Sequence, residues 1–254
     1  MLLVYIVTFT LGLALGSFIN VVISRLDRKE GLFWGRSECP QCLAKLKWYD
    51  LFPILSYLLL RGRCRYCQEK ISYIYPVVEL TTAIVLTAYF AFNGLILDIS
   101  TGYTMLMLLL LTALVFFDLV YLIIPDKIII ILVSASLVYN IFFRQPFFYN
   151  FLISGFIFGT FFAIIHLMSN GEWMGLGDAK LALAIGFILG YPAGFFAIVI
   201  SVWLAALCGV SMILLKRANL KTALPFGSFL STLSIIFIIF QNEIQKIQFV
   251  QRFL

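Results

Sequence analysis

Long apolar runs recur along nearly the whole sequence. Eight of them lie at about residues 1–24, 75–93, 103–124, 127–143, 149–168, 178–191, 192–215 and 225–241. A helix that crosses the hydrocarbon core of a bilayer needs about 20 apolar residues, and helices satisfy their backbone hydrogen bonds without water. The chain is 63% hydrophobic and 12% charged, which is far from the composition of a soluble domain. We therefore predict an all-α polytopic membrane protein with about eight transmembrane helices.

The loop after the first apolar run carries most of the net charge. Residues 25–72 contain ten Lys or Arg and five Asp or Glu, so that this loop holds +5 of the chain's +6. Positive loops stay in the cytoplasm, which predicts that the N-terminus is outside and the loop inside. No basic segment precedes the first run, so we interpret it as a membrane helix and not as a cleaved signal peptide. We expect the charge to attract membrane lipid, and no nucleic-acid-binding module accompanies it.

Four of the five cysteines lie in this loop as two Cys-x-x-Cys pairs, Cys39 with Cys42 and Cys64 with Cys67. Two such turns can close a tetrahedron of thiolates around Zn²⁺. A pair of disulfides is the alternative, which the reducing cytoplasm disfavours. Four thiolates leave no open coordination position, so the zinc is predicted to be structural. The fifth cysteine, Cys208, is expected to be a packing residue.

Two aspartates adjoin or interrupt apolar runs, and such residues are functional-site candidates because charge is costly in a membrane. Asp118 lies deep in an apolar run, and Asp178 follows Gly175 and Gly177, which permit a tight turn or a close approach of backbone. Counting helices from the basic loop places both aspartates, and Asp126, at the cytoplasmic face. Two carboxylates brought together can share a proton and activate water. A helix cap or first-turn acid is the ordinary alternative for Asp178, and Asp126 is ranked below Asp118 because it starts a helix near water.

The other polar residues of the apolar regions give little support to a function other than that of an aspartate pair. The single histidine, His166, is expected to be a hydrogen-bonded side chain at the inner end of the fifth helix, and no Ser/His or Cys/His nucleophile set is present. A transporter with intramembrane acids is an alternative, but the two halves of the sequence show no inverted repeat. A membrane methyltransferase without protease activity is a further alternative.

The order and spacing of these motifs resemble those of the bacterial type IV prepilin peptidases, over nearly the whole length. The matching residues are Gly16-Ser17-Phe18-Ile19-Asn20, Cys39-Pro40-x-Cys42, Trp48-Tyr49-Asp50, Cys64-x-x-Cys67, Tyr75-Pro76-x-Val78-Glu79, Asp118, Gly175-x-Gly177-Asp178-x-Lys180 and Pro225-Phe226-Gly227. The sequence departs from the family pattern mildly, at Asp27, Leu176 and Ala179.

The resemblance implies an intramembrane aspartic endopeptidase of the inner membrane. Members of that family cut the basic leader from prepilins or pseudopilins of pilus, type II secretion and competence systems at the cytoplasmic face. Many then methylate the new N-terminus with S-adenosylmethionine, although a protease-only member is an alternative. The resemblance makes Asp118 and Asp178 the catalytic pair, supported by Gly175, Gly177 and Lys180.

The same resemblance suggests a role for Glu79 in binding substrate or methyl donor. A buried, hydrogen-bonded acid is the alternative for that residue. The expected functional division is a first transmembrane helix (1–24), a cytoplasmic zinc-binding domain (25–74) and a transmembrane protease core (75–254).

Overall fold

The computed structural model describes residues 2–26, 37–96, 98–217, 219 and 222–246. Several charged residues of the basic loop, and two later in the chain, lie outside the described residues: Asp27, Arg28, Lys29, Glu30, Arg36, Lys221 and Arg252. The chain divides into two compact units, Met1–Leu95 and Ile96–Leu254. The first unit groups the helix that starts near residue 75 with the first helix, and the functional division expected above stays a prediction.

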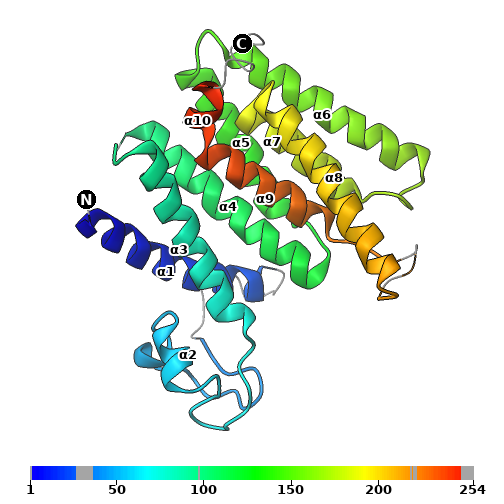
Figure 1. Cartoon of the computed structure of the whole chain (residues 1–254). Helices are drawn as coiled ribbons and strands as arrows, with labels where there is room; N and C mark the ends of the chain where they lie inside the picture. The colour runs from blue at the N-terminus through cyan, green and yellow to red at the C-terminus, as the bar shows by residue number, and fades with distance from the viewer. Residues whose placement is uncertain (1, 27–36, 97, 218, 220–221, 247–254) are drawn as a thin grey trace. The chain divides into compact units, whose positions relative to one another are not determined.

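The first unit is built on two long helices, α1 (Leu2–Arg25) and α3 (Ile74–Asn93). They pack along each other, as Figure 1 shows, at two glycines spaced four residues apart. A Cβ atom on Gly12 would lie 2.5 Å from the Cα of Ala83, and one on Gly16 would lie 2.6 Å from the Cα of Glu79. Small residues at this spacing let helix backbones approach closely in membranes. The loop between the helices contains a 3₁₀ turn, η1 (Trp48–Asp50), and a short helix, α2 (Leu55–Leu59).

The second unit is entirely helical in its described regular structure. Its helices are α4 (Ile99–Tyr121), α5 (Asp126–Phe143), α6 (Phe148–Met168), α7 (Leu176–Leu189), α8 (Ala193–Leu214), α9 (Phe226–Ile239) and α10 (Gln241–Lys246). The central helix is α7, which contacts α5, α6, α8 and α9 (Figure 1). Leu181, Ala182, Ala184 and Ile185 have no exposed surface, so α7 is enclosed by its neighbours.

All eight predicted apolar runs form helices, but they differ in length. Among the described residues, six helices are long and apolar enough to cross a membrane: α1, α3, α4, α5, α6 and α8. The other two, α7 and α9, have 14 residues each. At 1.5 Å per residue each is about 21 Å long, which is less than the roughly 30 Å of a hydrocarbon core. The prediction of a helical membrane protein is confirmed, and two of its helices are shorter than a simple span.

The tightest packing in the second unit joins α6 to α7. A Cβ atom on Gly186 would lie 2.4 Å from the Cα of Gly155, and one on Gly159 would lie 2.7 Å from the Cβ of Leu183. A side chain larger than hydrogen therefore has no room at this interface. The position of α7 is fixed along its length by glycines on both helices.

Polar side chains bind the C-terminal end of α7, where helix carbonyls lose their intrahelical partners. The side-chain amide of Asn140 donates to the Phe187 carbonyl at 2.8 Å, and the Arg144 guanidinium donates to the Ile188 carbonyl at 2.8 Å. Asn150 accepts the Tyr191 backbone N–H at 2.7 Å. The short helix thus ends inside the protein with its terminal carbonyls bonded.

Candidate functional site

Asp118 lies in the last turn of α4 and is almost fully buried, with 5% of its surface exposed. Its Oδ2 atom accepts a hydrogen bond from the backbone N–H of Ser228 at 2.6 Å. Ser228 is the third residue of α9, after Pro225 at the N-cap. The carboxylate is therefore bound at the N-terminal end of a helix far away in the sequence.

Asp178 lies in the first turn of α7, whose N-cap is Gly175. The helix starts at Leu176, two residues earlier than the sequence suggested, so Asp178 is a first-turn acid and not the N-cap. The Asp178 carboxylate lies close enough to Asp118 for their charges to interact. The structure thus brings together the two aspartates that the sequence singled out, from the end of α4 and the start of α7.

The two glycine motifs beside these aspartates meet at one side chain, Ile124. A Cβ atom on Gly177 would lie 3.0 Å from the Cβ of Ile124, and one on Gly227 would lie 2.7 Å from its Cδ1. Gly177 therefore serves a close approach, as the sequence allowed. Gly175 has φ −70° and ψ 147°, an extended conformation that any residue adopts, so it does not supply the tight turn that was expected.

Lys180 forms an ion pair with Asp126, with Nζ 2.6 Å from Oδ1. Asp126 is the first residue of α5, which agrees with its predicted role as a helix-start acid. The two side chains are 39% and 63% exposed. This pair links the starts of α5 and α7 at the surface, and it leaves Asp126 in a different environment from buried Asp118.

His166 fixes the segment that leads into α7. Its Nδ1 atom lies 2.8 Å from the backbone carbonyl oxygen of Met174, and its ring lies against Gly171. The predicted role of His166 as a hydrogen-bonded side chain is confirmed. Its partner, one residue before Gly175, shows that it also orders the approach to the Asp178 turn.

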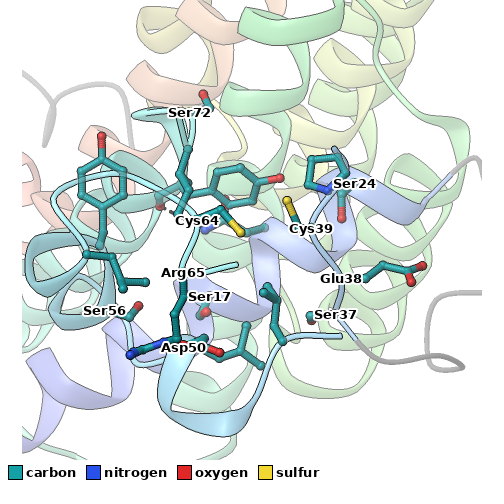
Figure 2. Close-up of a pocket in the computed structure, with 18 of the residues that line it drawn as sticks. Ser17, Ser24, Ser37, Glu38, Cys39, Asp50, Ser56, Cys64, Arg65 and Ser72 are labelled. Atoms are coloured by element: carbon teal, nitrogen blue, oxygen red, sulfur yellow. Dashed lines mark hydrogen bonds and ion pairs between the residues drawn. The ribbon is translucent and has the colours of Figure 1, made fainter. Parts of the chain in front are cut away.

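The four predicted cysteine ligands form one cluster in the first unit. Their Sγ atoms all lie within 4.8 Å of one another. Figure 2 shows two of them, Cys39 and Cys64, beside the cavity described below.

The two Cys-x-x-Cys turns have the same backbone pattern. In the first turn, the Leu43 N–H donates to the Cys39 carbonyl and the Cys39 N–H donates to the Ala44 carbonyl. In the second turn, Gln68 and Glu69 make the equivalent bonds with Cys64. The residue after each second cysteine, Leu43 or Gln68, has a positive φ of 56° or 60°. Two matched turns with converging sulfur atoms are the arrangement that a tetrahedral metal needs.

The chemistry of the donors also fits a metal. A backbone hydrogen bond from Cys42 lowers the pKa of the Cys39 thiol to about 7. At Cys67 a backbone hydrogen bond from Glu69 lowers the pKa, but desolvation and the neighbouring thiols outweigh it and raise the pKa to about 12. The thiolate is the form of cysteine that binds metal. With four sulfur ligands available, the cluster suits Zn²⁺ in a closed site that has no position for a reacting water.

A cavity of about 730 Å³ lies in the first unit beside this cluster. Its walls come from α1, from the cysteine loop and from the start of α3, as Figure 2 shows for the loop residues Asp50 and Arg65. Polar groups from all three parts line it, including Ser17, Asn20, Arg25, Asp50, Arg65 and Glu79. This volume lies within the usual range of small-molecule sites.

Glu79 lines this cavity and is buried, with 8% of its surface exposed. Its carboxylate accepts the backbone N–H of Ile54 at 2.8 Å. Glu79 is therefore a buried, hydrogen-bonded acid that faces a cavity, and its role in binding substrate or methyl donor stays a prediction. It belongs to the first unit, whereas Asp118 and Asp178 belong to the second.

Sequence reasoning did not identify the partners of these residues. Asp50 forms an ion pair with Arg65 at 2.7 Å and accepts a hydrogen bond from the Tyr66 hydroxyl at 3.2 Å. The motif Trp48-Tyr49-Asp50 was the signal in the sequence that could have pointed to Asp50. Ser228 was missed as well, although the motif Pro225-Phe226-Gly227 stands directly before it.

Two family models match the chain over separate segments. Residues 10–92 match the bacterial Peptidase A24 N-terminal domain, and residues 105–210 match the type IV leader peptidase family. The first segment contains the cysteine cluster and Glu79, and the second contains Asp118 and Asp178.

Similar proteins cover almost the whole chain. Three are named prepilin leader peptidase/N-methyltransferase. The one from Aeromonas hydrophila is 31% identical over 96% of this chain and 93% of the relative. The one from Bacillus subtilis (strain 168) is 30% identical over 94% and 95%, and the one from Legionella pneumophila is 32% identical over 89% and 88%. No solved structure matches the chain significantly.

Proposed function

The chain belongs to the type IV leader peptidase family, and from this membership we propose that it is an intramembrane aspartic endopeptidase that removes the basic leader of prepilins or pseudopilins. The observation that supports the proposal is the placement of Asp118 and Asp178 in the second unit, where the first turns of α7 and α9 both contact Ile124 and α9 binds the Asp118 carboxylate. One is buried at the end of α4 and the other lies in the first turn of α7. Asp118 is buried and Asp178 is half-buried, and placing two acids near each other is costly because each raises the cost of the other's charge.

In the proposed mechanism the two carboxylates hold one proton between them, since like charges at close range do not both ionise. The ionised aspartate removes a proton from water, and the water oxygen bonds to the scissile carbonyl carbon. The protonated aspartate donates its proton to the carbonyl oxygen. The tetrahedral intermediate then collapses as its C–N bond breaks and a proton passes to the leaving amine.

The proposed topology follows from charge. The N-terminus lies outside, and the basic loop and the aspartate pair face the cytoplasm, where the leader of a prepilin would be. In this topology α7 and α9 complete the set of eight apolar helices. Residues 25–74 form the zinc-binding domain, and the helices of 75–254 supply the protease core.

Structural Zn²⁺ is proposed for the site formed by Cys39, Cys42, Cys64 and Cys67. When bound, the metal would tie the two Cys-x-x-Cys turns together and stabilise a loop that is too short to build its own core. The convergence of the four sulfur atoms within 4.8 Å supports this assignment.

S-adenosylmethionine is proposed as the methyl donor, with the 730 Å³ cavity as its site. When bound, it would supply a methyl group to the N-terminal amine that cleavage releases. Glu79 lines the cavity, and its carboxylate suits a ligand with a positively charged sulfur and an amine, whereas Asp50 is already paired with Arg65. The same walls offer hydroxyl and amide groups, from Ser17 and Asn20, for its polar atoms.

A cleavage assay tests the function. Purified protein is mixed with a prepilin in detergent or lipid, and the products are analysed by mass spectrometry for loss of the leader and gain of a methyl group. Asp118→Asn and Asp178→Asn should each abolish cleavage while the protein still folds, because a carboxamide neither accepts the proton nor carries it. Retained cleavage in either variant contradicts the assignment of the pair.

The same assay separates the alternatives. Cleavage without methylation, with and without added S-adenosylmethionine, identifies a protease-only member. Methylation of leader-free pilin without cleavage identifies a methyltransferase alone. If the folded protein carries out neither reaction on any prepilin, transport becomes the explanation for the two acids.

A further inference from the structure

The hydrogen bond between Asp118 and Ser228 joins residues that are 110 positions apart. It is short, with 2.6 Å between the Ser228 nitrogen and Asp118 Oδ2, and it is buried. Ser228 also lies beyond both segments that match the family models, which end at residues 92 and 210. The bond therefore adds to the surroundings of Asp118 a residue of α9, a helix that lies outside the matched segments.

The donor lies in the first turn of α9, and its N–H is shared between the Asp118 carboxylate at 2.6 Å and the Pro225 carbonyl oxygen at the longer distance of 3.2 Å. This end of a helix carries partial positive charge, which favours an ionised carboxylate over a protonated one. A backbone donor also has a fixed position, whereas a side-chain donor can rotate away. The geometry thus stabilises negative charge on Asp118 in particular.

Among the described residues of the second unit, few charged groups lie on the helices around Asp118. Asp178 on α7 is the one whose charge interacts with it. Asp126 and Lys127 lie at the start of α5, and Lys180 lies near the start of α7. Asp126 and Lys180 form an ion pair with each other at the surface. The described sequence of α9, Phe226–Ile239, contains no acidic or basic residue. The Ser228 N–H and the Asp178 carboxylate therefore act on Asp118 in opposite directions, because the N–H favours its ionised form and a neighbouring negative charge disfavours it.

We propose that the first turn of α9 positions the catalytic pair, with the Ser228 backbone N–H holding Asp118 as its ionised member. Asp118 is then the general base that takes a proton from water, and Asp178 is the acid that gives its proton to the scissile carbonyl oxygen. When the C–N bond breaks, the proton on Asp118 passes to the amine and Asp178 regains its own. This inference rests on the proposed function and assigns a separate role to each aspartate.

Gly227 explains how α9 comes so close. A Cβ atom there would lie 3.2 Å from Asp118 Oδ2 and 2.7 Å from the Cδ1 of Ile124. Any larger residue would push the turn away from the carboxylate. Gly227 and Ser228 thus act together, one by leaving space and the other by donating the bond.

The test removes the donor with Ser228→Pro. Proline has no N–H and is tolerated in the first turn of a helix. Loss of a hydrogen bond to a charged group should lower kcat/KM for prepilin cleavage by about tenfold to a hundredfold. It should also move the acidic limb of the rate–pH profile to higher pH, by about one to two units, because ionised Asp118 is less stable. A purely structural role for α9 would lower the rate without moving this limb.

Two control variants separate the donor from other effects. Ser228→Ala loses the hydroxyl but keeps the backbone N–H, so its acidic limb should stay at the wild-type pH. Phe195→Pro places proline at the same third position of another helix, α8, again directly after a glycine. The Phe195 side chain is exposed, so this variant should fold and keep the wild-type profile.

A wild-type acidic limb in folded Ser228→Pro overturns the inference, and so does an equal shift in Ser228→Ala. If Ser228→Pro does not fold, Gly227→Ala is compared with the wild-type glycine in an Ile124→Ala background, where the contacts with Cδ1 and Cγ1 are gone and the contact with Asp118 remains. The limb should again move to higher pH, and an unmoved limb counts against the inference. Cleavage that survives Asp118→Asn is a different result, because it removes the proposed function itself.

Discussion

The contact between α6 and α7 predicts that Gly186→Ala destabilises the second unit. The new methyl carbon would lie 2.4 Å from the Cα and 2.5 Å from the nitrogen of Gly155, where ordinary contacts are 3.4–4 Å. Both opposing atoms belong to backbone, so no side-chain rotation relieves the overlap. The two helices must separate by about 1 Å, which loosens contacts along the whole interface.

The expected size of this effect follows from two opposing terms. Overpacking of a well-packed interior costs about 1–3 kcal/mol, occasionally more. Replacing a helical glycine by alanine stabilises the helix by up to about 1 kcal/mol. With rigid backbone on both sides we expect a net loss of about 1–2 kcal/mol, which corresponds to a fall of about 2–8 °C in Tm for a chain of this size.

Gly102→Ala is the matched control, because Gly102 is also helical, in α4, and has nothing within 4 Å of the position of a new Cβ. Thermal unfolding of the purified proteins in one detergent compares the two variants with the wild type. Gly102→Ala should leave Tm unchanged or raise it slightly. Gly186→Ala should also cleave prepilin more slowly, because Asp178 lies eight residues before it on α7, about 12 Å along the helix.

A Gly186→Ala protein with a Tm equal to that of Gly102→Ala would refute this reasoning. It would mean that α6 and α7 have room to spare at Gly155, and that the close approach does not determine where α7 lies.

Three other predictions concern the rest of the molecule. Cys39→Ser should reduce the zinc content measured by elemental analysis and lower protein yield, because three thiolates hold the metal less tightly than four; a fully stable protein without metal would count against a structural site. Asp126→Asn should keep cleavage within about tenfold of wild type, because its exposed pair with Lys180 contributes only about 0–1 kcal/mol; a variant as inactive as Asp178→Asn would reverse the ranking of the acids. His166→Ala should speed hydrogen exchange in residues 169–175 relative to the helices, because the bond to the Met174 carbonyl is lost; unchanged exchange there would show that other contacts order this segment.

The positions of the helices could be predicted from sequence because each apolar run is long and bounded by polar or turn residues. The prediction of a run at 178–191 and the observed α7 differ by two residues at each end. The cysteine cluster was equally accessible, since the spacing of Cys39, Cys42, Cys64 and Cys67 carries the geometry of the site. In these cases the information is local in the sequence.

The contacts that position the aspartates could not be predicted in the same way. The bond from Ser228 to Asp118 and the ion pair of Lys180 with Asp126 depend on which helices become neighbours, and apolar periodicity does not determine this. The close contact of Gly186 with Gly155 is an intermediate case. The spacing of Gly155 and Gly159 is a known signal for helix packing in membranes, but it does not name the partner helix.

The short length of α7 has a consequence for how the protein responds to its lipid environment. Helices that face lipid tilt or deform the bilayer when their hydrophobic length does not match its thickness. The helix that carries Asp178 is enclosed by neighbours, three of which, α5, α6 and α8, have 18 to 22 residues. Its terminal carbonyls are bonded to Asn140 and Arg144 rather than exposed to hydrocarbon. We therefore expect the outer helices to accommodate hydrophobic mismatch. Changes in membrane thickness should then have little effect on the geometry around Asp178.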